Sequence, residues 1–142
     1  MQAEVLSSFA LLVPAAFAAT HAPSNALAGA HAVAIGLSAL LSIVYWTTDD
    51  RGALQLDRVA ARVRAAIDVA ALSIALTRDI RRGMLPLGLA LLALGLYHAS
   101  VVTHHDNGDA RLVSLFHTTF HVIGLMGEIA LIGAAYALAS RP

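Results

Sequence analysis

The chain has 142 residues, 58% of them hydrophobic and 13% charged, and its nine acidic residues balance nine basic residues, all of which are arginine. Soluble domains usually carry about a quarter charged residues, so a mean hydropathy of +0.74 indicates a protein that lies mainly in lipid. The zero net charge leaves no basic excess to neutralise phosphates, so nucleic acid is not expected as a partner. Because cysteine is absent, disulfides, thiolate nucleophiles and thiolate metal sites are excluded as well.

Four stretches are apolar enough to cross roughly 30 Å of hydrocarbon, which takes about 20 residues. They cover residues 5–20, 26–46, 84–102 and 112–138. The first stretch is short and contains Pro14, but it lacks the positively charged start of a signal peptide, since no arginine precedes Arg51. We therefore expect this stretch to be retained as a membrane span.

A fifth segment, residues 56–77, has helical periodicity with Val59 and Val63 on one face and Arg64 and Asp68 on another. Either this helix lies on the membrane surface and the chain crosses four times, or it is a fifth transmembrane helix. The arginines favour four crossings, because eight of the nine then lie on one side. The prediction is an all-α integral membrane protein, a four-helix transmembrane bundle plus an amphipathic interfacial helix. Five transmembrane helices are the alternative.

The same arginine distribution predicts that both termini face the cytoplasm, because that side of a membrane collects arginine. We expect one membrane domain, surrounded by lipid and placed in a bacterial inner membrane. Since the chain has no soluble catalytic domain, it is predicted to be an accessory subunit of a larger bioenergetic membrane complex, with other membrane subunits as partners. Whether it is an enzyme stays open at this point.

Seven histidines accompany this apolar sequence. With four crossings, every histidine falls on the outer side, so all seven imidazoles are predicted at one end of the bundle. Helical periodicity places His117, His121 and Glu128 on one face of the last span, while His31 lies near the start of the second and His98 ends the third. Polar groups inside spans are costly in contact with lipid, so these side chains should point into the bundle.

These side chains predict a site for a metal ion or for a metal-tetrapyrrole such as haem or chlorin. His117 and His121 are four residues apart, so one zinc, copper or iron ion can take both imidazoles, with His98 as a third ligand. In the tetrapyrrole alternative, His31, His98 and Glu128 would contact the cofactor, because imidazole is the usual axial ligand of haem iron. A further alternative is a structural subunit in which the histidines only form hydrogen bonds between helices.

The sequence around Ser42, which continues to Tyr45-Trp46 and then Leu56-Asp57, resembles the CREST superfamily when combined with the pair His117 and His121. That superfamily of membrane hydrolases includes alkaline ceramidases, progestin and adipoQ receptors, and myomaker. The resemblance implies a zinc-dependent hydrolase in which Ser42 and Asp57 are catalytic and the histidine pair holds zinc. Trp46 stands where the family has its first zinc-binding histidine.

Overall fold

The computed structural model describes residues 2–48, 50–105 and 109–136, and these residues are almost entirely helical. The elements in chain order are α1 (Gln2–Ala10), α2 (Leu12–His21), the 3-10 turn η1 (Ala22–Ser24), α3 (Ala26–Thr48), α4 (Arg51–Arg78), α5 (Ile80–His105) and α6 (Ala110–Tyr136). The predicted all-α fold is confirmed.

Four segments are long and apolar enough to cross a membrane, as predicted, which makes the chain an integral membrane protein. They are Val5–Ser24, Ala26–Thr48, Ile80–His104 and Ala110–Tyr136. The last two residues of the predicted span 112–138 lie outside the described part of the chain.

Acidic and amide side chains fix where the four long helices begin. Each helix follows an Asn or Asp whose side-chain oxygen accepts a backbone N–H two residues further on, at 2.8 to 3.0 Å. These capping residues are Asn25, Asp50, Asp79 and Asp109. Because the first amides of a helix have no partner inside the helix, such caps favour a helix start at these positions.

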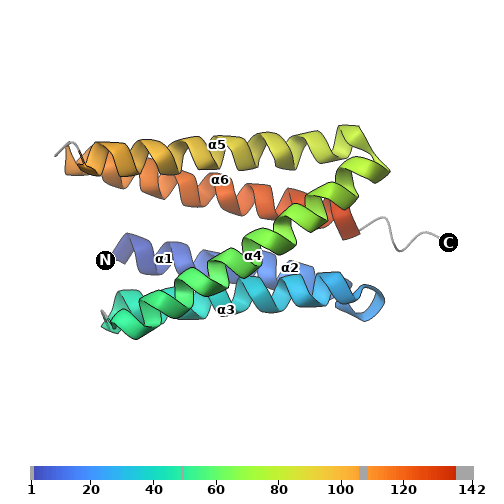
Figure 1. The fold of residues 1–142 in the computed structure, drawn as a ribbon, viewed down its shortest axis with the longest axis horizontal. Helices are drawn as coiled ribbons and strands as arrows, with labels where there is room; N and C mark the ends of the chain where they lie inside the picture. Colours follow the sequence, from blue (N-terminus) through green and yellow to red (C-terminus); the bar gives the residue numbers. More distant parts are fainter. Residues whose placement is uncertain (1, 49, 106–108, 137–142) are drawn as a thin grey trace.

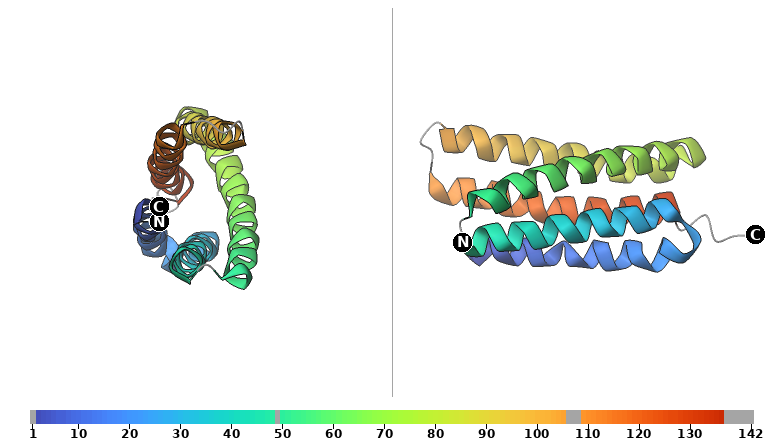
Figure 2. Two further views of the ribbon diagram at one scale, coloured as in Figure 1. Left: turned by 90° about the vertical axis from the view of Figure 1, so that its left-hand side faces the viewer. Right: turned by 60° about the horizontal axis from the view of Figure 1, so that its bottom comes forward.

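The long helices run back and forth along one axis (Figure 1). Helices α1 and α2 form the first pass and α3 returns beside them. Helix α4 crosses diagonally from the end of α3 to the start of α5, and α5 and α6 form an antiparallel pair (Figures 1 and 2). Viewed along this axis, the helices form a ring in which α4 closes the side between α3 and α5 (Figure 2).

The position of α4 bears on the choice between an interfacial helix and a fifth transmembrane helix. Its start and its end lie at opposite ends of the bundle (Figures 1 and 2), as the five-helix alternative requires. By length and hydropathy, however, α4 is not among the four described helices that could cross a membrane. Arg64, which the arginine count treats as exposed to water, makes an ion pair with Glu128 inside the bundle.

This arrangement also bears on the predicted placement of the histidines. The described chain starts and finishes at opposite ends of the bundle (Figure 1). The histidines divide in the same way. His21 ends α2 at one end of the bundle, and His104 lies close to the end of α5 at the other, so the imidazoles do not all gather at one end.

Small side chains fill the contacts between helices, while many large apolar side chains face outward. The buried cluster consists mainly of alanines such as Ala18, Ala28 and Ala71. Val33 and Leu6, in contrast, are about 70% exposed, at 70% and 68%. Close approach through small residues is typical of helices that associate in lipid, where burying a leucine brings no hydrophobic gain. The packing therefore agrees with a bilayer around the bundle.

Candidate metal centre

The face of α4 that turns into the bundle carries alanines together with two charged residues. Ala60, Ala71 and Ala75 are buried, and Arg64 and Asp68 lie between them at helical spacing with only 23% and 28% of their side chains exposed. The opposite valine face, which includes Val59 and Val63, is exposed. The charged face of α4 is thus brought to the neighbouring helices, and its apolar valine face is left exposed.

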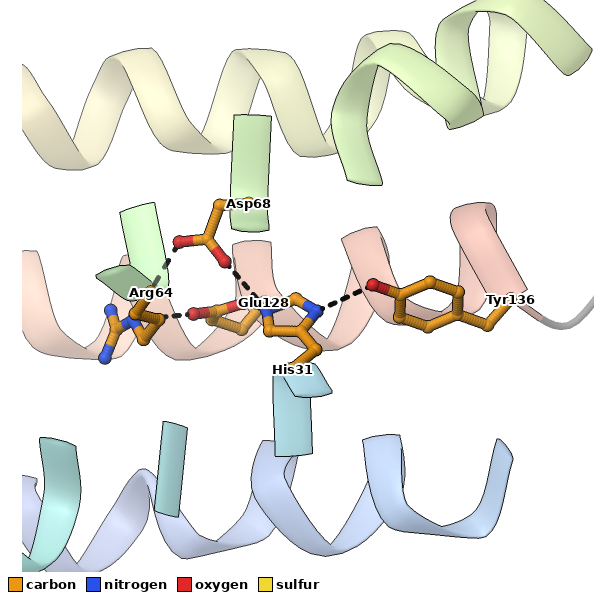
Figure 3. A network of polar contacts seen from close by, with 5 residues as sticks. All are labelled: His31, Arg64, Asp68, Glu128 and Tyr136. Carbon is orange, nitrogen blue, oxygen red and sulfur yellow. Dashed lines mark hydrogen bonds and ion pairs between the residues drawn. The ribbon is translucent and has the colours of Figure 1, made fainter. Parts of the chain in front are cut away.

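Three ligand-type side chains meet at this point from three different helices. His31 of α3 lies with its Nε2 atom 2.7 Å from Oδ1 of Asp68 on α4 and 3.3 Å from Oε2 of Glu128 on α6 (Figure 3). Their ligand atoms all lie within 4.8 Å of one another, and among the described residues this is the group of three that could hold a metal ion. His31 is fully buried and Glu128 is 6% exposed.

The converging atoms are not satisfied by ordinary hydrogen bonds. Nε2 of His31, Oδ1 of Asp68 and both carboxylate oxygens of Glu128 are buried, and within the described residues they meet as close ion pairs but make no hydrogen bond of normal geometry. Buried polar atoms in proteins nearly always have hydrogen-bond partners, so a group of buried atoms without such bonds suggests a site for an ion. One nitrogen and carboxylate oxygens are ligands that zinc and divalent iron or manganese accept.

Tyr136 contacts the other side of the same imidazole. Its hydroxyl lies 3.1 Å from Nδ1 of His31 (Figure 3). Tyr136 is the last residue of α6. When Nδ1 carries the proton and donates it to this oxygen, the lone pair is on Nε2, which faces the two carboxylates. Metal-binding histidines commonly have such a partner on the second nitrogen, because it fixes the tautomer and the ring orientation.

The histidines predicted as metal ligands do not come together in one site. His117 and His121 lie side by side on α6, with their Nε2 atoms 3.1 Å apart. His98 is exposed on α5 and does not join them in a group of three ligands within the described chain. Of the predicted cofactor contacts, the structure brings together His31 and Glu128 but not His98.

The two catalytic residues implied by the CREST resemblance are in contact. Ser42 of α3 donates a hydrogen bond of 3.5 Å from its Oγ to Oδ2 of Asp57 on α4. They lie in the half of the bundle that contains the end of α3 and the start of α4. Helix α6 begins in the same half (Figure 1). His117 and His121 occur in the first half of α6.

Searches among protein-family models, curated proteins and solved structures found no match to this chain. The candidate function therefore depends on the residues themselves.

Asp68 and Tyr136 were not among the residues predicted for the site. The available signal for Asp68 was its position four residues after Arg64 on a helix that could enter the membrane, where a charged pair needs a reason to be present. Tyr136 gave no comparable signal, because its partner is 105 residues away in the sequence.

Proposed function

We propose that this protein binds one divalent metal ion inside the membrane, with His31, Asp68 and Glu128 as its protein ligands. The observation that carries the proposal is the convergence of their buried ligand atoms from α3, α4 and α6 without normal hydrogen bonds. Since the three residues come from three helices, an ion held by them would also join these helices to one another. Metal binding of this kind is coupled to folding.

The donor set supports a single ion rather than a tetrapyrrole. Haem and chlorin sites use one axial imidazole on each side of a large planar ring, whereas here two carboxylates from Asp68 and Glu128 lie within 3.3 Å of the His31 nitrogen. Zinc, divalent iron and divalent manganese all accept mixed nitrogen and oxygen ligands. Three protein ligands leave further coordination positions for water or another small ligand, as in catalytic metal sites.

Elemental analysis of the detergent-purified protein, first stripped with a chelator and then reloaded with zinc, tests the proposal. The wild-type chain should bind one ion per chain. The isosteric variants Asp68→Asn and Glu128→Gln, and the variant His31→Ala, should lose it while keeping their helical circular dichroism and elution volume. One ion bound equally by wild type and by all three variants would overturn the assignment, as would a failure of the wild type to bind any.

The matched control is the pair His117→Ala and His121→Ala. These imidazoles lie on α6 like Glu128 but outside the proposed group of ligands, so the double variant should retain the ion.

A second candidate is a zinc-dependent hydrolase of the CREST type, which the contact between Ser42 and Asp57 supports. In that case zinc would be held by His117 and His121, and Ser42 and Asp57 would act in catalysis. The same zinc measurement separates the candidates, because the hydrolase requires zinc to be lost in the His117→Ala/His121→Ala variant and kept in His31→Ala.

A further inference from the structure

Arg64 binds the outer side of the proposed metal ligands. Its Nε atom lies 3.0 Å from Oε1 of Glu128 and 3.8 Å from Oδ2 of Asp68. These are not the oxygens that face His31, which are Oε2 of Glu128 and Oδ1 of Asp68. Arg64 can therefore keep both carboxylates in place while their inner oxygens hold an ion (Figure 3).

A cavity of about 450 Å³ adjoins this group between α4, α5 and α6. Its charged wall consists of Arg64, Asp68 and Glu128, and the remainder is almost entirely apolar, with Phe120 and Gly124 among the lining residues. Volumes of this order are typical of small-molecule sites. Through this cavity a further ligand could reach an ion held by the two carboxylates.

The charges of the group do not balance when a divalent ion is present. Two carboxylates, one guanidinium and a neutral imidazole carry a net charge of minus one, so a divalent ion changes the total to plus one. The next carboxylate along α4, Asp57, lies eleven residues or about three turns before Asp68, beside Ser42. An uncompensated charge inside a membrane protein is costly.

The geometry points to a site that holds its divalent ion together with one monovalent anion, which binds the ion from the cavity. The anion is required because the positive charge of Arg64 leaves the metal-loaded site with a net charge of plus one. This inference rests on the proposed metal site. It goes beyond that site because it names a second ligand, an anion with an oxygen or nitrogen donor such as hydroxide, azide or a monocarboxylate. Arg64 acts through the carboxylates and is a positioning residue.

Substitution with cobalt provides the test, because the visible spectrum of Co²⁺ responds to its ligands. The cobalt-loaded wild-type protein is titrated with azide, and the spectrum should change with saturation at one azide per ion. In Arg64→Gln the site is neutral once Co²⁺ is bound, so Co²⁺ should bind more tightly and azide at least tenfold more weakly. Arg64→Lys keeps the charge and should retain azide binding.

Opposite changes in the two affinities distinguish this role from simple damage, which would weaken both. If Arg64→Gln binds azide as tightly as wild type, or if cobalt in the wild type ignores azide, the inference is wrong while the metal site stands. Failure of the wild type to bind Co²⁺ at all would instead remove the proposed function.

Two glycines on α6 test whether the anion reaches the ion through the cavity. A Cβ atom on Gly124 or on Gly133 would meet no other atom within 4 Å, but only Gly124 lines the cavity. Gly124→Leu should lower the affinity of cobalt-loaded protein for benzoate at least tenfold, and Gly133→Leu should leave it unchanged. Equal benzoate affinity in the two variants would contradict entry from the cavity.

Discussion

The hydroxyl of Tyr136 lies 3.1 Å from Nδ1 of His31, and the two rings meet edge to face with their centroids 5.9 Å apart. This contact joins the end of α6 to the early part of α3 and turns the opposite ring nitrogen, Nε2, toward Asp68 and Glu128. The orientation of the proposed metal ligand is therefore set by a residue that does not itself contact the ion.

Removing this hydroxyl should weaken metal binding without abolishing it. Tyr136→Phe keeps the ring contact with His31 but loses the hydrogen bond, so we expect the affinity for Co²⁺ or Zn²⁺ to fall roughly 10- to 100-fold. The measurement is a competitive titration against a chelator of known affinity. Tyr97→Phe is the control, because Tyr97 is exposed on α5 and packs against Phe120. Equal affinities in the two variants would count against a role of Tyr136 in the site.

Metal binding should weaken as the pH falls. His31 binds an ion only through a neutral imidazole, so protons compete with the metal, and binding releases protons. A Co²⁺ titration at several pH values between about 5.5 and 8 should give an affinity that rises with pH, and a pH indicator should record proton release at low buffer concentration. The His117→Ala/His121→Ala variant should show the same dependence. A dependence that disappears in this variant would move the site to the histidine pair.

The crossing of α4 can be tested by single-cysteine labelling, since the natural chain contains no cysteine. The structure places Ser24 and Arg81 at one end of the bundle and Arg51 and Ala110 at the other. In sealed vesicles, a membrane-impermeant maleimide should label Ser24→Cys and Arg81→Cys from one side and the other two from the opposite side. An interfacial α4 would instead put positions 51 and 81 on the same side.

A glycine at position 83 should be required for the stability of the bundle, because α5 begins there in close contact with α4. A Cβ atom there would lie 2.6 Å from Cδ2 of Leu76 and 3.0 Å from its Cα, and the backbone atom cannot move aside easily. We expect Gly83→Ala to destabilise the bundle by about 1–3 kcal/mol, as overpacking usually does, even though alanine favours a helix by up to about 1 kcal/mol. Thermal unfolding in detergent measures the difference.

Gly88→Ala is the matched control on the same helix, because its Cβ would meet nothing within 4 Å. That variant should be as stable as wild type or slightly more so. Equal stability of the two variants would show that α4 and α5 approach less closely than described.

Much of the architecture follows from local sequence. Apolar runs of sufficient length predict the four candidate spans, and the residues Asn25, Asp50, Asp79 and Asp109 mark the helix starts because their short side chains satisfy the first free amides. The polar stripe of α6 correctly singled out Glu128 as a residue unlikely to face lipid, and it is buried. These features depend on composition and on neighbours within a few residues along the chain.

The direction in which each helix face points was decided only by the tertiary structure. The sequence of α4 has a charged face and an apolar face, and both a membrane surface and a bundle interior can accommodate such a helix. Partners on other helices decide between them: His31 and Glu128 compensate Asp68 and Arg64, and this makes burial of the charged face possible. The composition itself indicated a lipid-embedded protein without thiolate ligands, in which imidazole nitrogen is the expected ligand of any metal. Only one of the seven histidines, His31, meets two carboxylates in the described chain. That contact joins residues far apart in the sequence, and the periodicity of a single helix carries no information about it.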